Sequence, residues 1–260
     1  MADTTNHVIR MVNLTSGMVS TIAGTPGTGG WNIDGPASLT LLDTPCALAF
    51  APPRGSVMPF DLLWTEMGSL VIRRFDWFYV STVAGTPYTA GSTDGVAQVS
   101  TFGYNGPQGI TLLGDQVLVA DTGNHIIRKY DLGSQILSLY AGIAGSAGFK
   151  DGTVATALFN SPSAVVLDAS GGEAFVADGG NGVIRRLSGG YVTTVAGIPS
   201  TKGHLDGASG SAEFDVPQVS GCWMTNVNIY LQSAKPQNKL RRLLTLTCSF
   251  HLQPMNRCWL

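Results

Sequence analysis

The feature that most constrains the fold is a short segment that recurs along the chain, in which a carboxylate stands seven residues before an arginine. Clear copies occupy residues 3–10, 121–128 and 178–185, and an eroded copy occupies residues 66–73. The arginines of these copies, continued by Arg241, are separated by 63, 55, 57 and 56 residues. Self-similarity at a nearly fixed step is the sequence signature of repeat and propeller architectures. The sequence therefore predicts one array of related units.

Three independent sets of residues keep the same order and nearly the same step. They are the Asp-Gly pairs that begin at 34, 94, 151 and 206, the glycines that close apolar-Ala-Gly tripeptides at 24, 85, 142 and 197, and the prolines at 45, 107, 162 and 217. Their agreement places the units at about 3–24, 45–85, 107–142, 162–197 and 217–250 of a propeller over residues 1–250, followed by a non-repeat tail at 251–260.

The third unit shows what one repeat contains. Short apolar runs at 110–113, 116–120, 125–130 and 136–141 are separated by turn residues, of which Gly114-Asp115 is a hairpin signal. Four short strands joined by tight turns describe a propeller blade. The continuous run at 116–120 indicates a strand that is buried on both faces. The predicted fold class is therefore all-β, a β-propeller of four-stranded antiparallel blades, with about four to five blades present.

Composition narrows the partners and the compartment. Hydrophobic residues make up 44% and charged residues 12% of the chain, which supplies a core and argues against disorder. The net charge is −2, and nine of the 15 Lys and Arg residues belong to the recurrent strand, so a nucleic-acid partner is not expected. The four cysteines follow neither the repeat nor a metal-ligand spacing, so we expect no metal. With no long apolar run and no signal peptide, the sequence predicts no membrane span and favours a cytoplasmic location.

The recurrent charged residues are predicted to serve the scaffold. The carboxylate ends the second strand and the arginine lies in the third, so pairing between them, or with a neighbouring blade, offsets the cost of burying either charge. A residue needed once for chemistry has no reason to appear in every blade. The residues assigned to this structural set are Asp3, Arg10, Glu66, Arg73, Asp121, His125, Arg128, Asp178 and Arg185. The Asp-Gly pairs are expected to form turns in the long connections.

The Asn-His-apolar-Ile-Arg core at residues 6–10 and 124–128 resembles the NHL repeat, as do the segments Val19–Gly24 and Phe159–Pro162. The resemblance covers roughly residues 3–245 and implies a β-propeller, usually of six blades. Six blades at this step need roughly 330 residues, so 260 residues predict an incomplete or divergent ring whose open edges favour self-association. Two units depart from the pattern. The second has Met-Gly-Ser-Leu at residues 67–70 in place of Thr-Gly-Asn-His, and the fifth has Lys-Pro-Gln-Asn at 235–238 and lacks the carboxylate seven residues before Arg241.

Functional positions are expected where the repeat is broken, in the long connections on one face of the disc. The candidate binding residues there are Trp31, Tyr88, Phe149, Lys150, Lys202 and His204. His7 and His125 match the repeat and are expected to be structural. His204 is then a single histidine in a connection, which makes neither a catalytic triad nor a zinc site. We therefore predict no catalytic residues, no cofactor and a non-catalytic scaffold for protein or other ligand interaction. The alternatives are a propeller-type lyase or hydrolase with a metal in the central channel, and an RNA-binding NHL face.

Overall fold

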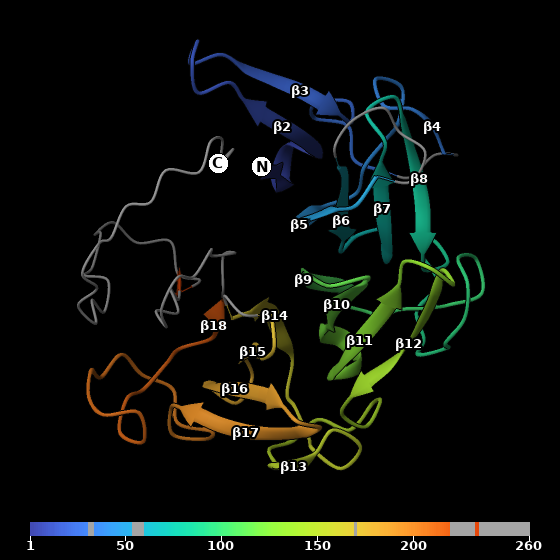
Figure 1. Cartoon of the computed structure of the whole chain (residues 1–260). Helices are drawn as coiled ribbons and strands as arrows, with labels where there is room; N and C mark the ends of the chain where they lie inside the picture. The colour runs from blue at the N-terminus through green and yellow to red at the C-terminus, as the bar shows by residue number, and fades with distance from the viewer. Residues whose placement is uncertain (31–33, 54–59, 169–170, 219–231, 234–260) are drawn as a thin grey trace.

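The computed structural model describes residues 1–30, 34–53, 60–168, 171–218 and 232–233, and the following concerns these residues. They form antiparallel sheets, with two short 3-10 turns, η1 (Thr4–Asn6) and η2 (Thr122–Asn124), as the helical elements. Figure 1 shows the sheets arranged around a common centre like the blades of a propeller. The all-β propeller architecture predicted from the repeat is confirmed.

The third blade contains the four strands expected from its apolar runs. They are β9 (Pro107–Leu113), β10 (Gln116–Asp121), β11 (Ile126–Asp131) and β12 (Ile136–Ala141). Their order in the sheet is β12-β11-β10-β9, so neighbours in sequence are neighbours in space. The register pairs Val119 with Ile110 on one side and with Arg128 on the other. The first strand begins at the recurrent proline, three residues earlier than the apolar run suggested.

The second and fourth blades repeat this order and add one outer strand each. The second contains β4 (Gly35–Pro36), β5 (Pro45–Ala51), β6 (Asp61–Glu66), β7 (Val71–Phe75) and β8 (Tyr79–Ala84). The fourth contains β13 (Gly152–Thr153), β14 (Pro162–Leu167), β15 (Ala174–Asp178), β16 (Val183–Ser188) and β17 (Tyr191–Ala196). In both, the outer strand comes from the long connection and pairs with the fourth strand of the blade that the connection leads into.

Two smaller sheets flank these blades. The first is three-stranded, with β1 (Ala2–Asp3), β2 (Val8–Val12) and β3 (Val19–Ala23) in that order. The other pairs β18 (Pro217–Gln218) with β19 (Gln232–Ser233). The division into a propeller at 1–250 and a tail at 251–260 stays a prediction, because residues 234–260 lie outside the described residues.

The core lies between the blades, which explains the continuous apolar runs. In β10, Val117 and Val119 pack against the second blade, while Leu118 and Ala120 pack against the fourth. All four of these side chains are fully buried. The first strands β5, β9 and β14 lie nearest the centre and the fourth strands β8, β12 and β17 lie at the rim (Figure 1). Contacts run from β5 to β9 and from β9 to β14.

The glycine that follows each fourth strand is required by its conformation. Gly24, Gly85, Gly142 and Gly197 have φ of 92°, 96°, 102° and 100°, a region that side-chain-bearing residues rarely adopt. A Cβ at each would lie 3.1–3.2 Å from an apolar side chain of the connection, namely Leu42, Phe102, Phe159 or Phe214. The recurrent glycine thus lets the chain turn sharply while the connection packs against it.

Candidate functional site

One end of the blades carries the recurrent carboxylates and the starts of the first strands. Each first strand begins beside the carboxylate that ends the second strand, since Pro107 pairs with Asp121 and Pro162 pairs with Asp178. The long connections begin after the fourth strands and enter the first strands at this same end, while their segments β4 and β13 run along the rim to the starts of β8 and β17. We call this end the loop-bearing face. The starts of the fourth strands, such as Tyr191, lie at the opposite end.

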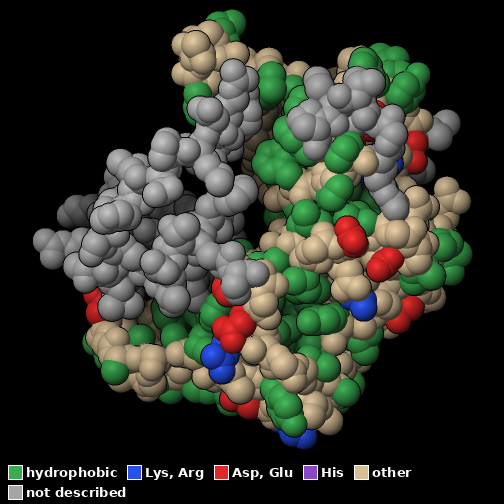
Figure 2. Space-filling view, viewed as in Figure 1, with side chains coloured by type: hydrophobic (Ala, Val, Ile, Leu, Met, Phe, Trp, Pro, Cys, Tyr) green, Lys and Arg blue, Asp and Glu red, His purple; other side chains and the backbone are tan. Residues whose placement is uncertain are grey.

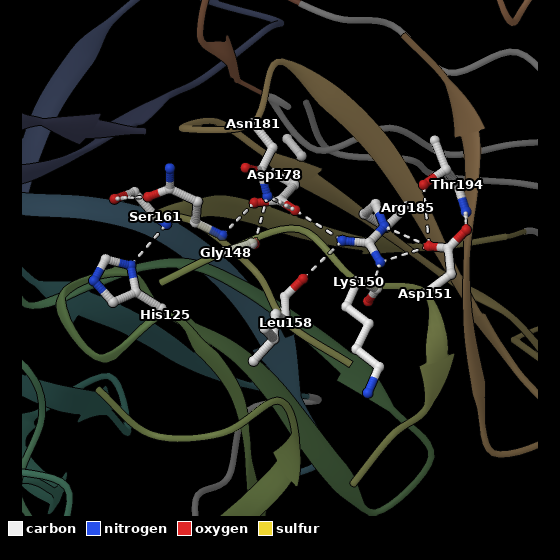
Figure 3. A network of polar contacts seen from close by, with 12 residues as sticks. His125, Gly148, Lys150, Asp151, Leu158, Ser161, Asp178, Asn181, Arg185 and Thr194 are labelled. Carbon is white, nitrogen blue, oxygen red and sulfur yellow. Dashed lines mark hydrogen bonds and ion pairs between the residues drawn. The ribbon is translucent and has the colours of Figure 1, made fainter. Parts of the chain in front are cut away.

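The fourth blade shows how the recurrent charges are used (Figure 3). Arg185 is fully buried, and its guanidinium donates to the Asp178 carboxylate at 2.9 Å. It also donates to the carbonyl oxygens of Leu158 at 3.0 Å and Lys150 at 2.8 Å, both in the connection. Burial raises the pKa of Asp178, against the opposing effect of the bonds it accepts from the Asn160 N–H, Asn181 and Arg185. The arginine therefore joins its own blade to the connection that precedes it.

Asp151, one of the Asp-Gly residues expected only to form a turn, is the second carboxylate partner of Arg185. Its Oδ1 lies 2.6 Å from a terminal nitrogen of the guanidinium, and its Oδ2 accepts from the Thr194 N–H at 3.0 Å. This carboxylate therefore accepts a hydrogen bond from a backbone N–H of the fourth strand, β17. Asp94 and Asp34 accept from backbone N–H groups of the third and second blades in the same way. The spacing of the Asp-Gly pair and the arginine, 39 residues in the second unit and 34 in the third and fourth, was the signal for this pairing.

We call the contacts of Arg185 with Asp178 and Asp151 the clamp, and the other blades carry versions of it. In the third blade, Arg128 contacts both Asp121 and Asp94 and is fully buried. In the first, Arg10 lies 3.3 Å from Asp3. The second blade departs from the pattern, as its sequence did.

In that second blade, Glu66 accepts hydrogen bonds from Trp64 Nε1 at 2.9 Å and the Ser69 hydroxyl at 2.6 Å. Arg73 forms its ion pair with Asp34 at 3.5 Å, and within the described part of the chain its guanidinium nitrogens make no hydrogen bond. Burial raises the pKa of Glu66 and lowers the pKa of Arg73. The glutamate carboxylate keeps the bond from the connection, where the Asp43 N–H donates to it at 3.1 Å, but it bonds to Trp64 and Ser69 of its own blade in place of the arginine.

The histidines of the motif join successive blades. His125 has φ of 60°, and its Nδ1 accepts from the Ser161 N–H at 3.0 Å (Figure 3). His7 accepts from the Thr44 N–H at 3.1 Å. Burial lowers the pKa of His125, with Asp121 opposing. A neutral imidazole that accepts at Nδ1 suits this role, so both side chains serve the scaffold.

The candidate binding residues lie on separate connections. Tyr88 is 55% exposed, and its hydroxyl donates to Asp43 at 3.2 Å. Phe149 is 38% exposed and its ring lies 4.9 Å from the Arg185 guanidinium carbon, so it also packs on the scaffold. Lys150 is exposed and its ammonium points away from the clamp (Figure 3). Lys202 and His204 are exposed on the connection into the fifth unit. Trp31 lies outside the described residues.

Sequence reasoning missed two adjoining cavities on the loop-bearing face, where the first strands begin near the centre. One, of about 310 Å³, is lined by Asn105, Gln108, Thr122, Ser161, Ser163, Gly179, Gly180 and Val216. The other, of about 350 Å³, is lined by Thr44, Met67, Gly68, Tyr104, Asn105 and Gln108. Asn105 and Gln108 line both. The sequence did contain a signal for these cavities: the residues next to each recurrent proline differ from unit to unit, and several of them line the cavities.

Three further features bear on chemistry. Among the described residues, no group of three or more His, Cys, Asp and Glu side chains is placed to hold a metal ion. Cys46 lies in β5 as a free thiol, and burial raises its pKa to about 11. The other three cysteines lie outside the described residues. In the part of the chain that the structure describes, no helix has the length and apolar character to cross a membrane.

These sheets and their clamps define a propeller-type protein, and comparison with known proteins leads to the same class. Residues 104–130 match the family model of the NHL repeat. Human NHL repeat-containing protein 2 is 40% identical over 85 residues, which is 32% of this chain and 11% of that protein. The chain thus contains a segment that matches the NHL repeat and spans only 11% of its human relative's length, and the resemblance inferred from the motif is confirmed.

Solved structures share the fold at low sequence identity. A structural-genomics protein from Bacteroides thetaiotaomicron VPI-5482 superposes with a TM-score of 0.59 at 19% identity, covering 87% of this chain and 62% of that one. An auxiliary nutrient binding protein from Bacteroides ovatus superposes with a TM-score of 0.53 at 16% identity, covering 80% of this chain and 52% of that one. At this identity the likeness concerns the fold alone.

Proposed function

We propose that the chain is a non-catalytic binding module whose loop-bearing face receives a protein partner. The observation that carries this proposal is the division of labour between repeated and unrepeated residues. The repeated arginines and the strand-ending carboxylates of the second, third and fourth blades are buried, whereas the unrepeated connections expose large side chains such as Tyr88, Leu205 and His204. Exposed aromatic and apolar groups on loops held by a rigid scaffold are typical of binding surfaces.

Charge favours a protein over RNA as the partner. Arg73, Arg128 and Arg185 are fully buried, so they add nothing to a basic surface. On the face seen in Figure 2, the lysine and arginine side chains of the described residues are few and separated from one another. Surfaces that bind nucleic acids need clustered cations.

The nutrient-binding description of the Bacteroides ovatus protein is a precedent for binding on this fold.

Site-specific photo-crosslinking tests the proposal. A benzophenone amino acid is placed at Tyr88 or at His204 on the loop-bearing face, and at Tyr191, 58% exposed at the opposite end, as the matched control. After irradiation in an extract of the cells that express the protein, we expect discrete protein adducts from the first two positions and none from Tyr191. Equal adducts from all three positions, or none from any, would contradict the proposal.

The same purified protein addresses the catalytic alternative. Elemental analysis after dialysis measures any metal carried by the full chain. One equivalent of tightly held metal would favour the alternative of a lyase or hydrolase with a metal in the central channel. We expect substoichiometric metal and unchanged crosslinking after treatment with a chelator.

A further inference from the structure

The two adjoining cavities on the loop-bearing face form a candidate ligand site, which we call the mouth groove. Each has a volume within the range of about 300–1,000 Å³ that small-molecule sites occupy. Asn105 and Gln108 stand between them and line both, so one elongated ligand can contact the two cavities at once. The groove is built from three consecutive units and belongs to no single repeat.

The lining residues exclude a charged ligand on electrostatic grounds. No Lys, Arg, Asp, Glu or His is among the lining residues of either cavity. The arginines of the three blades are fully buried in their clamps and offer no free charge to an anion. A charged ligand would lose hydration there without gaining a partner. The groove therefore suits a neutral molecule.

Two amide side chains supply the hydrogen bonds. The hydroxyls of Thr122 and Ser163 already donate to the carbonyl oxygens of Pro162 and Pro217, each at 2.8 Å. Within the described residues, no hydrogen bond occupies the side chains of Asn105 or Gln108. Each amide offers two donors and one acceptor oxygen, which matches adjacent hydroxyl groups that both donate and accept.

An aromatic ring stands at the edge of the groove. Tyr104 lines the second cavity and is 86% exposed, the largest exposure among the large apolar and aromatic side chains of the described residues. In the first cavity, a Cβ at Gly179 would lie 3.1 Å from the Ser161 carbonyl oxygen and 3.5 Å from the Val216 side chain, both of which line the cavity, so the glycine leaves this wall open. A flat, amphipathic ring beside free amides is suited to a ligand with a C–H face and hydroxyl edges.

We propose that the mouth groove binds a neutral oligosaccharide, with Tyr104 stacked on one sugar ring and with Asn105 and Gln108 bonded to its hydroxyls. A peptide would anchor through apolar side chains in apolar pockets, yet Met67 and Val216 are the aliphatic members of the lining. This inference goes beyond the proposed protein-binding role and does not rest on it.

Titration calorimetry on the full chain provides the test. The probes are cellotriose, maltotriose and chitotriose as neutral sugars, sialyllactose as an anionic sugar, and a blocked tripeptide of alanine. We expect at least one neutral trisaccharide to bind and the anionic sugar and the peptide not to bind. Tyr104→Ala and Gln108→Ala should each weaken binding about tenfold, the loss of roughly 1.4 kcal/mol. Tyr191→Ala, which removes another exposed ring, 58% exposed and at the opposite end, should leave the affinity unchanged.

Several outcomes would overturn the assignment. They are the absence of binding for all three neutral sugars, preferential binding of sialyllactose or of the peptide, or equal effects of Tyr104→Ala and Tyr191→Ala. Circular dichroism and the midpoint of thermal unfolding show whether each variant is folded before it is titrated. Crosslinking from Tyr88 is scored separately, so failure of this inference is distinct from failure of the proposed function.

Discussion

Replacing Arg185 by methionine removes the central group of the fourth-blade clamp while keeping a side chain of similar length. Arg185 is fully buried between the rings of Phe149 and Phe159, at 4.9 and 5.2 Å from their centres. Methionine can keep much of that packing. It cannot replace the hydrogen bonds to Asp178, Asp151 and the connection.

The expected loss of stability follows from what remains behind. Asp178 is also fully buried, and without Arg185 its charge has lost its counter-ion. Removing one partner of a buried pair typically costs about 3–5 kcal/mol, because the remaining charge is uncompensated. Two backbone carbonyls, of Leu158 and Lys150, lose a donor as well. We therefore expect the free energy of unfolding to fall by about 3–5 kcal/mol.

Urea unfolding followed by circular dichroism and by tryptophan fluorescence measures the change, provided that the two probes give coincident transitions. Arg186→Met is the matched control, because Arg186 is 43% exposed and lies 3.7 Å from Glu173. An exposed ion pair contributes about 0.2–1 kcal/mol, so this control should be nearly neutral. Adding Asp178→Asn to Arg185→Met removes the isolated charge, and the double variant should be more stable than the sum of the single effects by about 0.5–3 kcal/mol.

The pH dependence supplies a further check. Burial raises the pKa of Asp178, so the folded state binds that proton more tightly than the unfolded chain does. Such a group adds stability as the pH falls through its raised pKa, and loss of Arg185 raises the pKa further. The deficit of Arg185→Met should therefore shrink on acidification. A loss below about 1 kcal/mol, or one equal to that of Arg186→Met, would refute the account of the clamp as a buried, coupled unit.

Two other predictions concern the blade junctions. His125→Asn should lower the free energy of unfolding by about 0.5–1.5 kcal/mol at neutral pH, because the bond from the Ser161 N–H is lost. The pKa of His125 is lowered from 6.5, so the wild-type protein loses stability as the pH falls below that value and the difference between the two proteins should narrow. Urea titrations at several pH values measure this, with the exposed His204→Asn as a control that should change stability little. Gly142→Ala and Gly145→Ala both place a side chain at positive φ, which costs about 1–2 kcal/mol, but only the Gly142 Cβ is crowded, at 3.0 Å from the nearest side chain. Thermal unfolding should rank Gly142→Ala as clearly the more damaging, and equal effects would contradict the packing described for it.

Much of the fold was predictable because its causes are local and copied. Apolar runs, tight turns and the proline at the start of each first strand recur in every unit, so the four strands of the third blade could be placed within a few residues. The outer strands β4 and β13 could not, because each is two residues long and forms only where a connection meets the rim of the blade it enters. The candidate binding residues Tyr88, Phe149, Lys150, Lys202 and His204 remain predictions.

The sequence by itself determined the unit and its period, because both are set by residues within one repeat, and it predicted a scaffold role for the repeated charges. Only the tertiary structure decided which partners meet across repeats. The contacts of Arg185 with Asp151 and of His125 with Ser161 span 34 and 36 residues. The mouth groove likewise needs Met67, Gln108 and Ser163, which come from three different units, side by side. The rotation of each blade against the next fixes these distances, and a period along the chain does not contain that rotation.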